Sequence, residues 1–259
     1  MAGPPMSPVD GLPRLQFLNL DFVDAPMPEV VEAVRLASAA QLWTYLVTPN
    51  SAHLDLLGNN PDTLGPIWRG AGFLLLDSQV VRGFARLLLL DPPRVLTGSD
   101  LCVELFESVI GPATKVHVVC ANGRPVEEMA LARGLHRLTI AVPPMGLVHD
   151  PDAMRRVAEG IIRQQADFTF IAVGAPQQEM LAAMVGRMGG GRGIGVCIGA
   201  GLDFITGVQK RAPRWMRRIG LEWAYRFARE PRRLAKRYLI ESPRGMRLVL
   251  RAALRRRRG

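Results

Sequence analysis

Six short apolar runs, each followed by a segment with helical periodicity, constrain the fold of this chain more than any other feature. Strand-length apolar runs that alternate with helical patterns are typical of parallel strands joined by crossover helices. The runs predicted as strands are 42–48, 72–76, 115–121, 138–142, 168–173 and 193–199. An earlier unit, LQFLNLDFVDAPMPEVVEAVRLASAA, is predicted as one strand and then a helix. The sequence therefore predicts an α/β fold, a Rossmann-like parallel sheet with flanking helices.

The C-terminal part differs from the rest in pattern and in charge. Residues 209–259 contain 18 Lys and Arg against 3 acidic residues, a net +15, whereas residues 1–208 carry −5. Its helical pattern is interrupted by Pro213, Pro231 and Pro243, so we expect several short helices and no continuous rod. We therefore divide the chain into a Rossmann-like body, 1–208, and a basic helical appendage, 209–259. The charge of this appendage favours a polyanionic surface, either nucleic acid or anionic lipid.

Features that the sequence lacks disfavour several classes of protein. No basic segment followed by an apolar one opens the chain, and no apolar stretch approaches the roughly 18 residues that span a bilayer, so we expect a cytoplasmic protein. The three cysteines, Cys102, Cys120 and Cys197, are far apart, and we expect free buried thiols. The absence of a Walker A motif and of a full Rossmann glycine fingerprint disfavours ATP and nicotinamide, and we expect no cofactor.

One D-x-D pattern, Asp150 and Asp152, has two interpretations. Such a pattern holds a divalent metal against a diphosphate in many nucleotide-sugar enzymes. Here it contains a proline and precedes a helical segment, which favours helix capping. The four histidines show no metal-ligand spacing either, and we expect no metal site.

Asp77 ends the apolar run GFLLLD, where a strand buried on both faces is predicted to stop. Ligands of open parallel sheets collect beyond the carboxyl ends of the strands, and this rule selects the segments YLVTPN, LLLD, VVCANGRP and IAVGAPQQE. From pattern alone, Asp77 is either the N-cap of the next helix or a reactive carboxylate. Thr48 and Asn50 have the same two interpretations, and Gln178 is either an ordinary residue of a helix start or part of a site.

Five motifs follow one another along the chain: VTPN, LLLD, PPRVLTGSDL, GAPQQE and GAGLDFITGVQKRAPRWMRRIGLEWAYRFAREPRRLAKRYL. Together they resemble the WecG/TagA/CpsF family of bacterial glycosyltransferases, over residues 17–250. The resemblance implies transfer of a sugar from a UDP donor to a sugar on polyprenyl diphosphate, with inversion at the anomeric carbon, in cell-wall or exopolysaccharide biosynthesis. The sugar expected is N-acetylmannosamine, its uronic acid or a related hexose.

The resemblance also assigns roles to residues. Asp77 matches the proposed general base, and because an ordinary Asp with a pKa of about 3.9 is ionised near neutral pH, we expect little tuning of it. The other matching positions in the body are Thr48, Asn50, Arg94, Gly174 and Gln178. In the appendage, Arg226, Arg233 and Arg237 match arginines that close over the site, where their planar forks suit the UDP diphosphate.

The resemblance further implies work at the inner face of the cell membrane, where the charge of the appendage would suit an anionic surface, and it suggests dimers or trimers. One departure is Ser78, Gln79 and Val80 after Asp77, where the family has a glycine-rich turn, so substrate choice is expected to differ. Two alternatives stay open. A nucleic-acid-binding protein would use the same arginines on phosphates, and an inactive family member would act as a scaffold. We expect the enzyme, and no nucleic acid.

Overall fold

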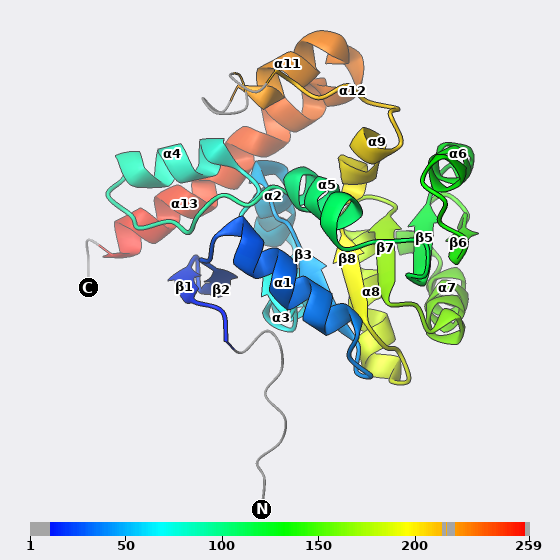
Figure 1. Ribbon diagram of the computed structural model, residues 1–259. Coiled ribbons are helices and arrows are strands. Elements are labelled where there is room, and N and C mark those ends of the chain that lie inside the picture. The colour runs from blue at the N-terminus through cyan, green and yellow to red at the C-terminus, as the bar shows by residue number, and fades with distance from the viewer. Residues whose placement is uncertain (1–10, 214–215, 217–220, 257–259) are drawn as a thin grey trace, which may run out of the picture.

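A six-stranded parallel sheet forms the centre of the molecule (Figure 1). The computed structural model describes residues 11–213, 216 and 221–256, without the side chain of Arg233. The strand order across the sheet is β4, β3, β8, β7, β5, β6. The bounds are β3 (Thr44–Val47), β4 (Phe73–Leu74), β5 (Val116–Cys120), β6 (Leu138–Ala141), β7 (Phe168–Ala172) and β8 (Ile194–Cys197). Each strand lies inside one of the six predicted runs, and the predicted Rossmann-like α/β fold is confirmed.

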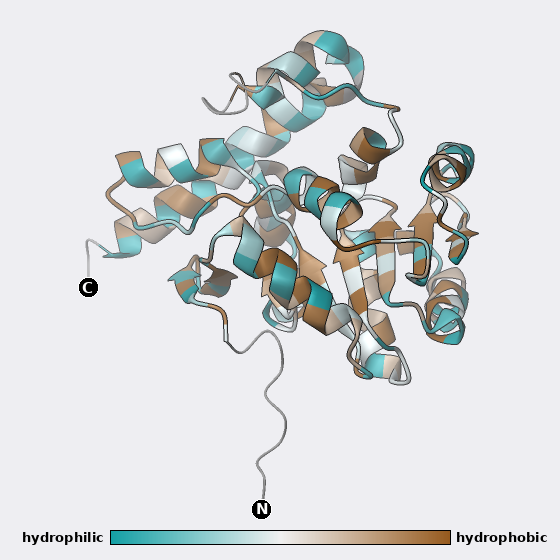
Figure 2. Ribbon diagram, viewed as in Figure 1, coloured by the Kyte–Doolittle hydropathy of each residue, from teal (hydrophilic) through white to brown (hydrophobic). Residues whose placement is uncertain are grey.

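Helices cover both faces of this sheet. One face packs against α1 (Met27–Ser38), α5 (Gly98–Ser108) and α6 (Arg124–Ala132). The other face packs against α2 (Ser51–Asn59), α3 (Pro61–Arg69), α4 (Gln79–Leu87), α7 (Pro151–Gln164) and α8 (Gln177–Met188). Figure 2 shows the apolar strands between helices that are apolar on one side only. In β3, Leu46 joins the first apolar cluster and Val47 the second, as the period of two in a strand requires.

The N-terminal unit is a hairpin, so the prediction of a single strand before the first helix is wrong. β1 (Arg14–Phe17) pairs antiparallel with β2 (Leu20–Val23). The two turn residues, Leu18 and Asn19, have φ of 55° and 59°, which is the left-handed backbone of a two-residue hairpin turn. This turn usually contains glycine, and a leucine in it carries no sequence signal.

The C-terminal part is helical from Glu222 to Arg256, as predicted; Pro231 separates two helices, but Pro243 does not interrupt the second. α11 (Glu222–Arg229) ends before Pro231, and then α12 (Pro231–Lys236), the π-helical segment η3 (Arg237–Glu241) and α13 (Ser242–Arg256) follow one another without a gap. The expectation of no continuous rod is therefore wrong for residues 231–256. Because η3 interrupts the regular α-helical bonding, Pro243 stands in the first turn of α13, where a missing N–H costs least.

α13 packs along α2 and beside α4, so the C-terminal segment lies against the body (Figure 1). The hydroxyl groups of Ser51 and Ser242 are 2.8 Å apart, and Val249 and Ala253 of α13 are buried. The remaining short segments are η1 (Leu147–His149), η2 (Gly199–Gly201) and α9 (Leu202–Ile205). Among the described helices, none combines the length and the apolar character needed to cross a membrane.

Candidate active site

A cavity of about 1010 Å³ lies at the carboxyl edge of the parallel sheet. Its walls come from the segments that follow β3, β4, β7 and β8, and from α9, α11, η3 and the start of α13. Seven residues predicted from the sequence line it: Thr48, Asn50, Asp77, Gly174, Gln178, Arg226 and Arg237. The sheet topology brings the first five of these together because all strands of the sheet point the same way, whereas Arg226 and Arg237 come from α11 and η3 of the C-terminal segment.

Asp77 is not a helix cap. Ser78 is the N-cap of α4, and its hydroxyl accepts a hydrogen bond from the Val81 N–H at 3.1 Å. The Asp77 N–H donates to the carbonyl of Pro49, which fixes the residue beside the end of β3. Its carboxylate accepts from the N–H of Gly98, the first residue of α5, at 3.2 Å. The carboxylate therefore faces the cavity at the N-terminus of a helix from another part of the chain.

The pKa of Asp77 is not ordinary, which corrects the expectation of little tuning. Burial raises it from 3.8 to about 7. The Gly98 hydrogen bond and the positive charges of Arg237 and Arg226 lower it in part, and Glu222 raises it. Protein atoms surround this carboxyl group although the residue keeps some contact with solvent at the cavity. A carboxyl with a pKa near neutrality is matched to proton transfer at physiological pH.

Thr48 supports this arrangement from the neighbouring strand. It is 6% exposed, and its hydroxyl donates to the carbonyl of Cys197 at the end of β8. A Cβ on Gly98 would lie 2.9 Å from the Thr48 hydroxyl oxygen. The glycine at position 98 thus lets the start of α5 approach β3 closely enough for its N–H to reach Asp77.

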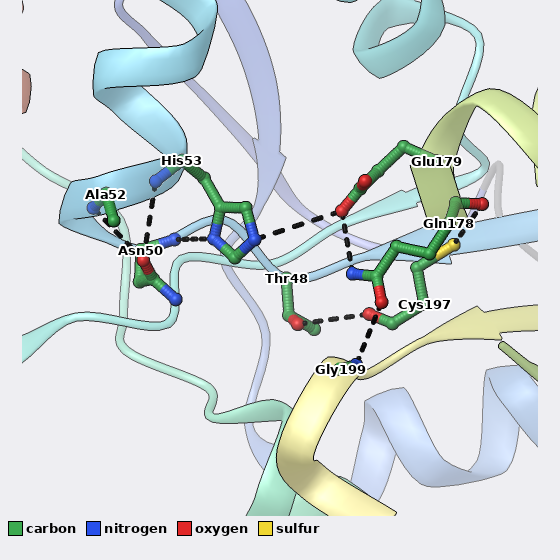
Figure 3. A network of polar contacts seen from close by, with 8 residues as sticks. All are labelled: Thr48, Asn50, Ala52, His53, Gln178, Glu179, Cys197 and Gly199. Carbon is green, nitrogen blue, oxygen red and sulfur yellow. Dashed lines mark hydrogen bonds and ion pairs between the residues drawn. The ribbon is translucent and has the colours of Figure 1, made fainter. Parts of the chain in front are cut away.

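A polar network in the cavity wall joins Asn50 to Gln178 (Figure 3). The Asn50 side chain caps α2 by accepting from the N–H groups of Ala52 and His53, as the capping interpretation predicted. The Asn50 N–H in turn donates to Nδ1 of His53. Nε2 of His53 faces Oε1 of Glu179 at 4.0 Å, and that oxygen also accepts from Gln178.

Gln178 is 2% exposed and both ends of its amide are engaged. Nε2 donates to Glu179 at 2.8 Å, and Oε1 accepts from the Gly199 N–H at 3.0 Å. Burial raises the pKa of Glu179 to about 7 and lowers that of His53 to about 3, with the charge of Arg237 adding to the second shift. His53 is therefore neutral, and because its Nδ1 accepts a hydrogen bond, its proton is on Nε2, toward Glu179.

Gly174 lies beside this network with a φ of +84° and lines the cavity. This left-handed backbone explains the glycine, since an L side chain there would be strained.

Two arginines of the C-terminal segment reach the cavity. Arg237, at the start of η3, is largely buried, and burial lowers its pKa while the Asp77 carboxylate acts in the opposite direction. The Nε and Nη2 atoms of Arg226, from α11, are buried without a hydrogen-bond partner among the described residues. Buried guanidinium donors are costly unless paired, so Arg226 is arranged for an anion that the cavity would hold.

Two predicted site residues and the helix-capping candidate Asp150 lie apart from this cluster or outside the description. Arg94 is not a cavity residue: its side chain is 55% exposed, and its Nε lies 3.6 Å from Asp24. Arg233 belongs to α12, and its side chain lies outside the described part of the chain. Asp150 caps α7 by accepting from the Ala153 N–H, and it is not in the cavity wall either.

Several residues in or beside the site were missed by the sequence analysis. His53 and Phe204 line the cavity, and Gly98 donates its N–H to Asp77. Glu179 accepts from Gln178, and Arg211 lies over the ring of Phe204. Glu179 stands beside Gln178 in GAPQQE, and Phe204 and Arg211 stand inside the long C-terminal motif, so motif membership was the available signal. His53 had no such signal, because an isolated histidine in a helical pattern is usually structural.

Comparisons with known proteins identify the family of this chain. Residues 15–259 match the family model described as "Glycosyl transferase WecG/TagA/CpsF family". An N-acetylglucosaminyldiphosphoundecaprenol N-acetyl-beta-D-mannosaminyltransferase of Bacillus spizizenii is 27% identical over 218 residues, 83% of each chain. A protein of the same name from Bacillus subtilis is 36% identical over 75 residues, 29% of each chain. Since the family model spans nearly the whole sequence, the chain belongs to the WecG/TagA/CpsF family of glycosyltransferases.

Proposed function

We propose that this protein transfers N-acetylmannosamine from a UDP donor to an N-acetylglucosamine carried on a polyprenyl diphosphate. The family supports the reaction class, and the names of the two Bacillus relatives support the sugars. The observation that carries the proposal is the cavity in which the Asp77 carboxyl, with its raised pKa, meets two arginines of the C-terminal segment.

The proposed chemistry is a single displacement with inversion. The acceptor hydroxyl attacks the anomeric carbon, and its proton passes to the Asp77 carboxylate. The bond from that carbon to the UDP oxygen breaks, and its electron pair leaves with UDP. Gly98 holds the carboxylate through its N–H, and Arg237 favours the ionised form that accepts the proton.

Positive charge for the departing diphosphate would come from Arg226 and Arg237. Both line the cavity, and Arg226 presents buried donors without protein partners among the described residues. Guanidinium groups suit phosphate oxygens in geometry and charge, and such fixed donors stabilise charge that develops on a leaving group. We therefore expect activity to be retained in excess EDTA.

We also propose that the enzyme works on an anionic membrane surface at the cytoplasmic face of the cell membrane. The polyprenyl chain of the proposed acceptor is anchored in a bilayer, and residues 209–259 carry +15. The C-terminal segment contacts the body through α13 and α2, so we propose that it closes the site from the body's edge.

The test is a transfer assay with purified protein, UDP-N-acetylmannosamine and a short-chain polyprenyl diphosphate N-acetylglucosamine, in which mass spectrometry detects the disaccharide product. Asp77→Asn should lower turnover about 10²- to 10⁴-fold while UDP binding is retained. Absence of product with this donor and with other UDP-sugars would favour an inactive scaffold. Wild-type turnover in Asp77→Asn would exclude Asp77 as the base.

A further inference from the structure

The ring of Phe204 contacts two guanidinium groups at the edge of the cavity. Arg226 lies with its Cζ 5.6 Å from the ring centroid, and Arg211 lies with its Cζ 5.4 Å from the same centroid. Phe204 belongs to α9, which follows β8, and it lines the cavity together with Arg226. One aromatic ring thus joins the body to α11 of the C-terminal segment.

Arg211 connects this ring to the first turn of α5. Its Nη2 donates to Oδ1 of Asp100 at 2.7 Å and to the hydroxyl of Ser99 at 3.0 Å. The same turn of α5 begins with Gly98, whose N–H binds the Asp77 carboxylate. A continuous series of contacts therefore runs from the proposed base, through the start of α5, to Arg211, Phe204 and Arg226.

We propose that Phe204, held by Arg211 against the first turn of α5, is a positioning residue that orients the Arg226 guanidinium toward the diphosphate of the donor. This inference rests on the proposed function, which identifies the diphosphate as the ligand. A cation over an aromatic face is attracted by the ring and leaves its edge N–H groups free. This matches Arg226, whose Nε and Nη2 have no hydrogen-bond partner among the described residues.

An aromatic ring can hold the Arg226 guanidinium without using its hydrogen-bond donors. A carboxylate beside Arg226 would hold it as firmly, but it would take the donors that the diphosphate needs and cancel their charge. Phe204 fixes the guanidinium through its flat face instead. Arg211 differs in that its Nη2 donates to Asp100 and Ser99, although its Nε has no hydrogen-bond partner among the described residues, and it acts as support for the ring.

The experiment measures UDP affinity by isothermal titration calorimetry in Phe204→Leu, Arg226→Ala and the double variant. Phe204→Leu should weaken UDP binding about 3- to 30-fold, the range of a cation–π contact, and Phe204→Tyr should stay within about twofold of wild type. Since Phe204 acts through Arg226, the loss should vanish in the Arg226→Ala background. Arg211→Gln, a second variant, should give a smaller loss that vanishes in the same background.

The matched control is Tyr225→Leu on α11, the helix of Arg226. It removes a ring that lies 5.7 Å from the Cζ of Arg229 and does not line the cavity, and it should leave UDP affinity unchanged. Wild-type affinity in Phe204→Leu, or the same loss with and without Arg226, would overturn the positioning role. Failure of the wild-type protein to bind UDP or inorganic pyrophosphate would instead overturn the proposed function, and with it the ligand assigned here.

Discussion

At the scale of single residues, the neighbours of Asp77 separate its two interpretations. Ser78 supplies the helix cap that Asp77 was suspected of supplying, so the carboxylate is left to face the cavity. The N–H of Gly98 and the arginines favour its ionised form, whereas burial favours its protonated form. Burial is the larger effect, and the group consequently titrates near neutral pH.

The first prediction concerns the pH dependence of activity. If Asp77 is the base, it must be deprotonated, so kcat/KM should rise with pH and level off above an apparent pKa of about 7. Initial rates between pH 5 and pH 9 measure this directly. A plateau that already begins near pH 5 would mean that the carboxyl of the free enzyme has its ordinary pKa.

The second prediction concerns stability. The folded state raises the pKa of Asp77 from 3.8 to about 7, so between these values the folded protein keeps a proton that the unfolded chain loses. The contribution of Asp77 to the free energy of unfolding therefore falls as pH rises from about 4 to 7, and this contribution stays constant above pH 7. Asp77→Asn removes the titrating carboxyl group. The free energy of unfolding of this variant, relative to that of wild type, should therefore rise between about pH 4 and pH 7.

At about 1.4 kcal/mol per pKa unit, the Asp77→Asn variant should be up to about 4 kcal/mol more stable than wild type at pH 8. Urea unfolding of both proteins at pH 4 and pH 8 measures the difference. If the two proteins differed by the same free energy of unfolding at pH 4 and pH 8, burial would not raise the pKa of Asp77.

At the scale of elements, the crossing of α13 and α2 decides whether the C-terminal segment reaches the site. A Cβ on Gly245 would lie 1.9 Å from the carbonyl oxygen of Ser51, so the two backbones approach too closely for any side chain. Because α13 follows η3 directly, the same crossing fixes the position of Arg237. Because the Ser51 carbonyl belongs to the backbone, it cannot move aside as the end of a flexible side chain can.

The third prediction compares two Gly→Ala changes in helices. Gly245→Ala should destabilise the protein by about 1–3 kcal/mol, the usual cost of overpacking, and should reduce transfer activity by displacing Arg237. Gly83→Ala in α4 is the matched control: its Cβ would meet nothing within 4 Å, and it should stabilise by about 0.5–1 kcal/mol. Urea unfolding and the transfer assay check both. Full activity in Gly245→Ala would show that α13 does not hold Arg237 in place.

At the scale of the whole molecule, α4 and α13 lie side by side and run away from the cavity (Figure 1). Ser78 and Ser242 begin them near the cavity, and at the far end Arg256 donates to the carbonyl of Leu89. Leucines are exposed along both helices: Leu87 at the end of α4 and Leu89 just after it, and Leu250 and Leu254 on α13. Exposed leucines among arginines fit the proposed contact with an anionic bilayer.

Because α13 packs against the body, deleting it is not a suitable test of the proposed membrane contact. Deletion of residues 244–259 would remove Val249 and Ala253, which pack against the body, and it would therefore disturb the site as well as the surface. Substitution of exposed residues avoids this problem. Residues 257–259 lie outside the described part of the chain, so Leu250 and Leu254 are the better targets.

The fourth prediction is that Leu250→Gln with Leu254→Gln weakens sedimentation with anionic liposomes about tenfold or more, because each leucine loses apolar burial in the bilayer. Activity on a short soluble acceptor should be unchanged. Leu42→Gln with Leu131→Gln is the control, since both leucines are exposed but lie elsewhere, Leu42 before β3 and Leu131 on α6. Equal liposome binding by the two double variants would place the membrane contact elsewhere.

The sequence by itself determined the six strands of the parallel sheet and the edge of that sheet that holds the site, but it did not indicate the N-terminal hairpin. Periodic apolar runs report the local backbone, and parallel strands necessarily collect Thr48, Asn50, Asp77, Gly174 and Gln178 at one edge. Family motifs then indicated which of the many arginines to consider, although Arg94 proved to lie on the surface beside Asp24.

Only the tertiary structure decided the electrostatics and the closure of the site. The pKa of Asp77 depends on how completely distant segments bury it, and the positions of Arg226 and Arg237 depend on a close contact between α13 and α2. The pair of His53 and Glu179 and the ring of Phe204 depend in the same way on residues far apart in the chain. Desolvation and packing are properties of the folded surroundings, and no local pattern contains them.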